Sequence, residues 1–535
     1  MLSMSVHYNW RDLFMQSTTS PLTKRRFWIF LSVLSLLAVF LAGVATSKYG
    51  AGVSSDATKY LSVAQNLLDG NGLFDHKGGP LLSWPPLYSI VIAGLSLLSS
   101  LDVFVAGWYF NVFLLGLNVF LSGVIFSRVF RNRPLYAYLA TLFVFLSISS
   151  LRIHANISSD PFYLTLTLGF LVAADDYIRK RSYLAFAWMV LFSILGPLQR
   201  YVGLAITVTA EIVILVENRK SIRTLLRDGL ILGLASVLPI AWWLFVRNVM
   251  TYGSLYGVGP QVVDPWMNTS LALTKMLHWF IPYLNFLMPL LMRPFITLGV
   301  LAFILLLLNR NTNENGNAWI QSLAAPAVYP TLVYAIVYFA ALAATVVTAD
   351  HRDLFSDRYY VILLVPTAIS ILLTFDKLVW PHLRTAPKQI WTGLVLLFAV
   401  WALYPLYSFS EYLMEARVVG EPSGANMFNN RTYREMDLVA EMQRLREQQP
   451  DTTFYSNYSD AVWFHTRRAV SPSVVLTEDP EVAYAGWPHD KPGYIIWFEP
   501  NEYKHYLSPE EIAKFADVQL IFDGKGGKIY SVQAR

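Results

Sequence analysis

The sequence predicts a polytopic α-helical membrane protein of about 11 transmembrane helices, followed by a small α/β domain outside the membrane. First, 55% of its 535 residues are hydrophobic and only 14% are charged, which is too apolar for a soluble chain of this length. Second, uncharged runs long enough to cross a bilayer recur along residues 1–408. Third, residues 409–535 change to a charged helical stretch and short alternating runs, which are typical of an α/β domain.

The first apolar run, Phe27–Thr46, follows Lys24, Arg25 and Arg26. Because basic flanks stay in the cytoplasm, we expect the amino terminus there. The run is longer than the apolar part of a signal peptide and no clear cleavage site follows, so we expect an uncleaved span. Further spans are expected at Val105–Phe126, Leu135–Ser150, Phe162–Tyr177, Tyr183–Leu198, Val202–Val216, Gly229–Phe245, Phe295–Leu308, Leu323–Val347, Tyr360–Thr374 and Ile390–Phe409.

Basic clusters between these spans indicate the topology of a multi-pass protein of the cytoplasmic (inner or plasma) membrane. They all fall on the cytoplasmic side if Pro86–Leu98 and Leu277–Leu291 do not cross fully, so we read both as interfacial or re-entrant segments. An odd number of crossings then places residues 409–535 outside the cytoplasm. The clusters comprise Arg128, Arg131, Arg133, Arg179, Lys180, Arg181, Arg219, Lys220, Arg223, Arg227, Arg310, Lys377, Arg384 and Lys388.

Charge and composition also exclude several functions. Residues 1–408 hold 28 Lys/Arg and 17 Asp/Glu, but the basic residues are scattered rather than gathered on one face, so nucleic acid is not an expected partner. The absence of cysteine removes disulfides, thiolate metal sites and thiol nucleophiles. No nucleotide-binding motif occurs, and the glycines around Gly524 read as a hairpin turn. No cofactor is required; a divalent metal is allowed, with His351 as a weak candidate ligand.

Residues 48–84 form the longest expected outer loop, and its segment SDATKYLSVAQNLL has the spacing of a helix lying on a membrane surface. Asp56, Lys59 and Tyr60 share one face of that helix. In the tail, a helix is expected at Met436–Leu445 and strands at FYSN, VWFH, YIIWF, QLIF and KIYSV.

Ionisable residues gather at the expected outer ends of the spans. Such charges cost a few kcal/mol each unless they are paired or face a cavity, so the pattern indicates a polar cavity on that side. Carboxylates mixed with guanidiniums suit a reaction in which a base activates a nucleophile while cations hold a phosphate leaving group. The residues are Asp56, Lys59, Asp160, Arg200, Arg247, Asp350, His351, Arg352, Asp353, Asp357 and Arg358.

Several motifs lie at these same positions. They are SSDATKYLSVAQNLLDGNG, WPPLY, NISSDPFY, LQRYVGL, FVRNVMTYGS and DRYYVILLVP. In order and placement, over roughly residues 20–410, the chain resembles the C-type glycosyltransferases that use polyprenyl-phosphate sugars, above all the lipid A aminoarabinose transferases and the protein O-mannosyltransferases. The resemblance implies a sugar donor on a polyprenyl phosphate and an inverting transfer outside the cytoplasmic membrane.

The resemblance also implies roles for individual residues. Asp56 matches the family's acidic base; its alternative role is to cap the helix that it opens. Asp160 matches a second carboxylate, and it too has a capping alternative because Pro161 follows. Lys59 and Tyr60 match the residues that reach the lipid phosphate in the aminoarabinose transferases, or else they anchor the loop at the membrane interface.

Three arginines at outer span ends, Arg200, Arg247 and Arg358, are expected to include at least one donor-phosphate ligand, with pairing to a carboxylate as the alternative. Two departures from the family count against assigning either relative's acceptor. Ala57 stands where the mannosyltransferases have glutamate, and Trp84 stands where the aminoarabinose transferases have lysine.

The sequence thus predicts a transmembrane glycosyltransferase domain at residues 1–408, with a catalytic loop at 48–84, and an extracytoplasmic domain at 409–535. Its expected partners are a polyprenyl-phosphate-linked sugar, membrane lipid and an extracytoplasmic lipid, glycan or protein acceptor. The alternatives are a lipid-linked-sugar flippase and a non-catalytic assembly factor. The role of the tail is open between acceptor binding, a lid and a docking module.

Overall fold

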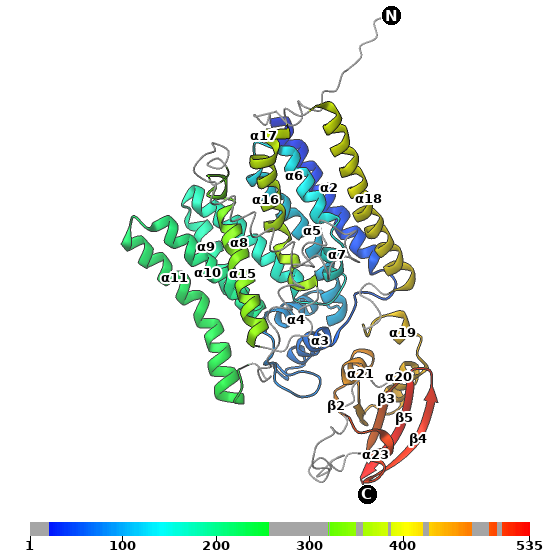
Figure 1. The fold of residues 1–535 in the computed structure, drawn as a ribbon. Coiled ribbons are helices and arrows are strands. Elements are labelled where there is room, and N and C mark those ends of the chain that lie inside the picture. Colours follow the sequence, from blue (N-terminus) through cyan, green and yellow to red (C-terminus); the bar gives the residue numbers. More distant parts are fainter. Residues whose placement is uncertain are drawn as a thin grey trace, which may run out of the picture.

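The computed structural model describes residues 21–255, 319, 321–348, 357–383, 387–420, 427–472, 492–499 and 506–534. These residues form a helical bundle and, at one end of it, a small α/β domain (Figure 1). The expected span Phe295–Leu308 and the expected interfacial or re-entrant segment Leu277–Leu291 lie outside the described residues, as do Asp350, His351, Arg352 and Asp353.

Long helices make up the bundle. Its helices are α2 (Pro21–Ala45), α4 (Leu87–Ser99), α5 (Val103–Val129), α6 (Pro134–Phe145), α7 (Ile148–His154), α8 (Asp160–Lys180), α9 (Tyr183–Gln199), α10 (Leu204–Asn218), α11 (Ile222–Ala241), α15 (Tyr329–Thr348), α16 (Leu364–Thr374), α17 (Trp380–Leu383) and α18 (Lys388–Val419). Short 3-10 turns lie at η1 (Tyr201–Gly203), η6 (Asp357–Tyr359) and η7 (Val361–Leu363), and π-helical turns at η2 (Trp242–Thr251) and η8 (Phe375–Val379).

Among the described residues, six helical segments are long and apolar enough to cross a membrane, or seven if the bent pair α6 and α7 is one span. The six are Arg25–Ala45, Val103–Val129, Tyr201–Asn218, Ile222–Thr251, Val361–Val379 and Gln389–Val419. Helix α4 lies over most of Pro86–Leu98, one of the two apolar runs that were not expected to cross the membrane fully. Its 13 residues reach about 20 Å, less than a hydrocarbon core of about 30 Å. The chain is therefore a multi-pass membrane protein, as its sequence predicts.

The contact between α2 and α5 shows how closely the bundle packs. A Cβ atom added to Gly116 of α5 would lie 2.7 Å from the backbone oxygen of Ser35 in α2. A Cβ atom on Gly123 would lie 2.3 Å from Leu31 Cδ1. Small residues let helix backbones approach inside a membrane, where packing rather than water exclusion drives association.

Paired charges lie at the end of the bundle away from the α/β domain. Arg128, at the carboxyl end of α5, donates to Asp175 at 3.0 Å and lies 3.2 Å from Asp176. Arg133 contacts Asp376 at 3.0 Å. The basic clusters of the sequence analysis that the structure describes are thus gathered at one end, while the helix α3 (Ser55–Leu68) lies at the other (Figure 1).

The α/β domain contains one five-stranded sheet. The sheet order is β2-β1-β3-β5-β4, with β1 (Thr453–Ser456) parallel to both β2 (Val470–Pro472) and β3 (Gly493–Phe498). Strands β4 (Ala516–Gly524) and β5 (Gly527–Ala534) form an antiparallel hairpin, and β5 pairs antiparallel with β3. The turn between them contains the glycines that the sequence analysis assigned to a hairpin. The helices are α19 (Arg431–Arg434), α20 (Asp437–Gln448), α21 (Ser459–Thr466) and α23 (Pro509–Ile512).

Two expectations from the sequence differ from the structure, one in this domain and one just before it. The run VWFH was expected to be a strand but lies in α21. The expectation was wrong because every residue of that helix is buried, so the sequence lacks the polar face by which a helix is recognised. The last helix of the bundle, α18, continues to Val419, so position 408 lies inside a helix rather than at its end.

Candidate functional site

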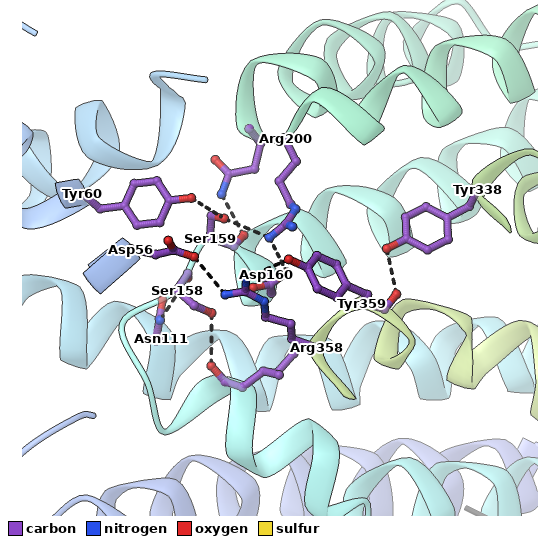
Figure 2. Close-up of polar contacts among 12 residues, drawn as sticks. Asp56, Tyr60, Asn111, Ser158, Ser159, Asp160, Arg200, Tyr338, Arg358 and Tyr359 are labelled. Atoms are coloured by element: carbon purple, nitrogen blue, oxygen red, sulfur yellow. Dashed lines mark hydrogen bonds and ion pairs between the residues drawn. The ribbon is translucent and has the colours of Figure 1, made fainter. Parts of the chain in front are cut away.

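A small polar pocket of about 50 Å³ lies at the end of the bundle that faces the α/β domain. It brings together side chains from α3, from the start of α8, from the α9–η1 turn and from η6 (Figure 2). Trp84, in the segment before α4, completes the lining. Five of the seven site residues predicted from sequence line the pocket. The lining residues are Asp56, Tyr60, Trp84, Ser158, Ser159, Asp160, Arg200, Arg358 and Tyr359.

Asp56 lies in the first turn of α3 and pairs with Arg358, whose Nη1 is 3.0 Å from Asp56 Oδ2. The helix is capped by Ser54 instead, whose side chain accepts a hydrogen bond from the backbone N–H of Ala57. The capping role weighed for Asp56 therefore belongs to another residue, and the carboxylate points into the pocket (Figure 2).

Asp160 is the more deeply buried carboxylate of the pocket, with a side chain only 2% exposed. Its Oδ1 accepts a hydrogen bond from Arg200 Nη1, while its Oδ2 is buried and has no hydrogen-bond partner among the described residues. The N-cap of α8 is Ser159, which makes no side-chain capping bond. Asp160 thus forms an ion pair in the pocket rather than a helix cap.

Hydroxyl groups lie between the two ion pairs. Arg200 Nη1 also donates to Ser159 Oγ at 3.2 Å, and the Tyr60 hydroxyl lies 3.2 Å from the same Oγ atom. Burial, and after it the charge of Asp56, raises the pKa of the Tyr60 phenol, so this group is a neutral hydrogen-bond donor. The pocket therefore combines two carboxylates, two guanidiniums and uncharged hydroxyls.

A backbone bridge holds the two acid-bearing segments together. The N–H of Gly52 donates to Ala155 O, and the N–H of Ile157 donates to Gly52 O, both at 2.9 Å. Asp56 and Asp160 each lie a few residues after the bridge, in the two segments that it joins. Their relative position is therefore fixed by main-chain hydrogen bonds and not only by the arginines.

Lys59 and Arg247 are the two predicted site residues that do not line the pocket. The Lys59 ammonium lies over the ring of Trp84, 4.4 Å from its centroid. Arg247 donates to the carbonyl oxygens of Leu81 at 2.5 Å and Leu73 at 3.3 Å, so it is attached to the backbone of the outer loop.

Four residues of the lining were not predicted to be functional from the sequence, namely Ser158, Ser159, Trp84 and Tyr359. Each lies inside a motif already quoted, beside or near a chosen residue. Tyr359 is held by a hydrogen bond from Arg358 Nη2 to its hydroxyl at 2.7 Å and by one from the Tyr338 hydroxyl to its backbone oxygen at 2.8 Å. Position within a motif was the only signal that could have identified them.

Within the part of the chain that the structure describes, no group of three or more His, Asp or Glu side chains is placed to hold a metal ion. His351, the weak metal candidate, lies outside that part.

Comparison with known proteins gives similarity in structure only. No protein-family model and no curated protein matches the sequence. The crystal structure of ArnT from Cupriavidus metallidurans bound to undecaprenyl phosphate is similar with a TM-score of 0.59 at 14% sequence identity, over 94% of this chain and 98% of that one. The apo form of the same protein also gives a TM-score of 0.59 at 14% identity, over 95% and 98%. The chain therefore has the C-type glycosyltransferase fold that its motifs indicate.

Proposed function

We propose that the protein is a membrane glycosyltransferase that moves one sugar from a polyprenyl-phosphate donor to an acceptor outside the cytoplasm, with inversion at the anomeric carbon. The observation that carries this proposal is the meeting of Asp56, Asp160, Arg200 and Arg358 in one pocket. A fold shared with a protein that binds undecaprenyl phosphate supports the same donor class.

The two arginines are the proposed ligands of the donor phosphate. A guanidinium presents N–H groups that match two phosphate oxygens at once, which an ammonium group does not. Both are already paired with carboxylates, so an arriving phosphate competes for them. The hydroxyls of Tyr60 and Ser159 provide neutral donors beside them.

Asp56 is the proposed general base. When the donor phosphate draws Arg358 toward itself, the lone pairs of the Asp56 carboxylate become available for an acceptor hydroxyl or amine. Asp56 takes the proton as the acceptor atom bonds to the anomeric carbon. The bond from that carbon to the phosphate oxygen breaks, and its electron pair leaves with the polyprenyl phosphate. General-base help of this kind contributes roughly a hundred- to ten-thousandfold in rate.

Asp160 has a supporting role in this proposal. It holds Arg200 beside the phosphate position, and its Oδ2, which has no partner in the described part of the chain, gives the pocket a second acceptor of hydrogen bonds. Arg247 and Lys59 act outside the pocket. Arg247 donates hydrogen bonds to backbone carbonyls of the outer loop, and the Lys59 ammonium lies over the ring of Trp84.

The proposed orientation is supported by the difference between the two ends of the bundle. Basic residues of cytoplasmic loops are the strongest topological signal, and Arg128 and Arg133 lie at the end away from the pocket. The amino terminus is then cytoplasmic, and the pocket and the α/β domain face the other side of the membrane.

The test uses purified full-length protein in detergent with undecaprenyl phosphate carrying mannose, glucose, arabinose or aminoarabinose, and with an extract of cell-envelope lipids, glycans and proteins as the source of acceptor. Release of undecaprenyl phosphate is measured for the native chain and for Asp56→Asn. We expect a loss of at least a hundredfold on substitution. Equal release by both would remove Asp56 as the base, whereas movement of the intact donor across liposomes without bond cleavage would indicate a flippase.

A further inference from the structure

The α/β domain is attached to the segment that leads into α3. Asn429 Nδ2 donates to Tyr49 O at 2.6 Å and to Ala51 O at 2.9 Å. The N–H of Phe428 donates to Val53 O at 2.8 Å. These bonds enclose Gly52, whose backbone bridge connects the segment of Asp56 to the segment of Asp160.

Apolar contacts make the attachment continuous. Residues of α3, such as Ala57 and Leu61, share one buried cluster with Leu438 and Phe464 of the domain. The rings of Phe104, at the start of α5, and Phe464 meet edge to face with centroids 5.4 Å apart. The domain is therefore packed on the outer loop rather than tethered to it.

One charged side chain of the α/β domain contacts the start of α3. Asp460 of α21 accepts a hydrogen bond from Ser55 Oγ at its Oδ2. Its Oδ1 lies 2.9 Å from His76 Nε2 and 3.4 Å from Lys77 Nζ. The Asp460 carboxylate is 12% exposed and the His76 side chain is fully buried.

The Asp460 carboxylate is ionised in this position. Burial alone would raise its pKa, but the adjacent His76 and the charge of Lys77 outweigh burial and lower the pKa below its ordinary value. A charge that is both buried and paired is costly to disturb, because removing one partner leaves the other without compensation.

These contacts bear on the pocket because they lie next to Asp56. Ser55 is the residue before Asp56, so a bond to Ser55 fixes the first turn of α3 and with it the direction of the Asp56 side chain. His76 and Lys77 lie beyond the other end of the same helix. One carboxylate therefore joins both ends of the α3 segment to the domain.

We propose that Asp460 is a positioning residue for Asp56, and that the α/β domain is an integral part of the catalytic unit. This inference rests on the proposed transferase function. A displacement of about 1 Å in a reacting group costs on the order of a hundredfold in rate, so holding the first turn of α3 has a direct kinetic effect.

The test compares Asp460→Asn with the milder Ser55→Ala, which removes one bond and keeps the contacts of His76 and Lys77. Asp451→Asn, a change of the same chemistry at an exposed position of the same domain, is the matched control. Release of undecaprenyl phosphate from the four donors gives kcat and KM. We expect kcat to fall about 10- to 100-fold for Asp460→Asn and less for Ser55→Ala, with the donor KM within about twofold. The control should not change.

Two further readouts separate positioning from simple destabilisation. The double variant should be no slower than Asp460→Asn alone, because both changes remove the same bond. Hydrogen exchange of residues 52–60 should accelerate in Asp460→Asn while exchange in α5 and α8 stays as in the native chain.

Each outcome has a defined meaning. Unchanged exchange at residues 52–60, or faster exchange there with an unchanged kcat, overturns the positioning role. Faster exchange throughout the bundle, or a donor KM that rises as much as kcat falls, also overturns it, since Asp460 would then be merely structural. If the native chain releases no undecaprenyl phosphate, the proposed function fails, and the exchange measurement still decides whether Asp460 holds α3.

Discussion

Replacement of Arg358 tests the competition between Asp56 and the donor phosphate. The Arg358 Nη1 atom lies 3.0 Å from Asp56 Oδ2, and the two side chains are 24% and 28% exposed. Each is therefore partly screened by water, which reduces the strength of the pair. Arg358→Lys keeps the positive charge but loses the fork of N–H groups, while Arg358→Met loses both.

The expected magnitudes follow from these contacts. A hydrogen bond to a charged group is worth about 1.5–3 kcal/mol, and every 1.4 kcal/mol is tenfold in affinity. Because the site is partly exposed, the lower part of that range applies to Arg358→Lys, so undecaprenyl phosphate should bind about tenfold more weakly. Arg358→Met should weaken binding about a hundredfold. Asp56→Asn should act in the opposite direction and tighten binding, because Arg358 then has no carboxylate to release.

Binding of undecaprenyl phosphate to purified protein, measured by the shift of the thermal midpoint across ligand concentrations, gives these affinities. Arg152→Lys is the matched control: Arg152 is exposed on α7 and stacks on Tyr412 outside the pocket. The reasoning is refuted if Arg358→Met binds within twofold of the native chain, or if Asp56→Asn weakens binding.

Two other predictions concern the outer loop and the α/β domain. Arg247→Leu should accelerate hydrogen exchange at residues 73–81, because the carbonyls of Leu73 and Leu81 lose their donor. The same change should lower the affinity for undecaprenyl phosphate far less than Arg358→Met does. An equal loss of affinity would instead support the phosphate-binding role that the sequence suggested for Arg247. Burial, and after it the charge of Arg434, lowers the pKa of His465 from 6.5 to about 3. The unfolded chain therefore binds the extra proton first, so stability should fall by about 1.4 kcal/mol per pH unit below pH 6.5, and thermal midpoints of His465→Gln should lack that slope.

The architecture of the bundle could be predicted because it depends on local signals. Apolar length marks the spans, and the arginines and lysines between them mark one end, as Arg128 and Arg133 confirm. The motifs likewise located the pocket, because five of the six contribute at least one side chain to its lining. Neither inference required knowledge of tertiary contacts.

The details of the site could not be predicted, because they depend on contacts between distant residues. Arg358 and Asp56 are 302 positions apart, and Asp460 and Ser55 are 405 apart. Nothing local distinguishes Arg200, which enters the pocket, from Arg247, which binds loop carbonyls, since both are arginines at the ends of spans. The strand expected at VWFH was wrong for a related reason: a helix buried on all sides has no polar face to reveal its period.

The two ion pairs of the pocket have a consequence for selectivity. Abundant phospholipids also present a single negative phosphate at the bilayer surface, and a pocket with free arginines would retain them. With each guanidinium already neutralised by its own carboxylate, an incoming headgroup gains little unless its remaining parts also make favourable contacts. Under the proposed function, internal pairing would therefore set a threshold that an ordinary membrane lipid does not cross and that a correctly shaped carrier can.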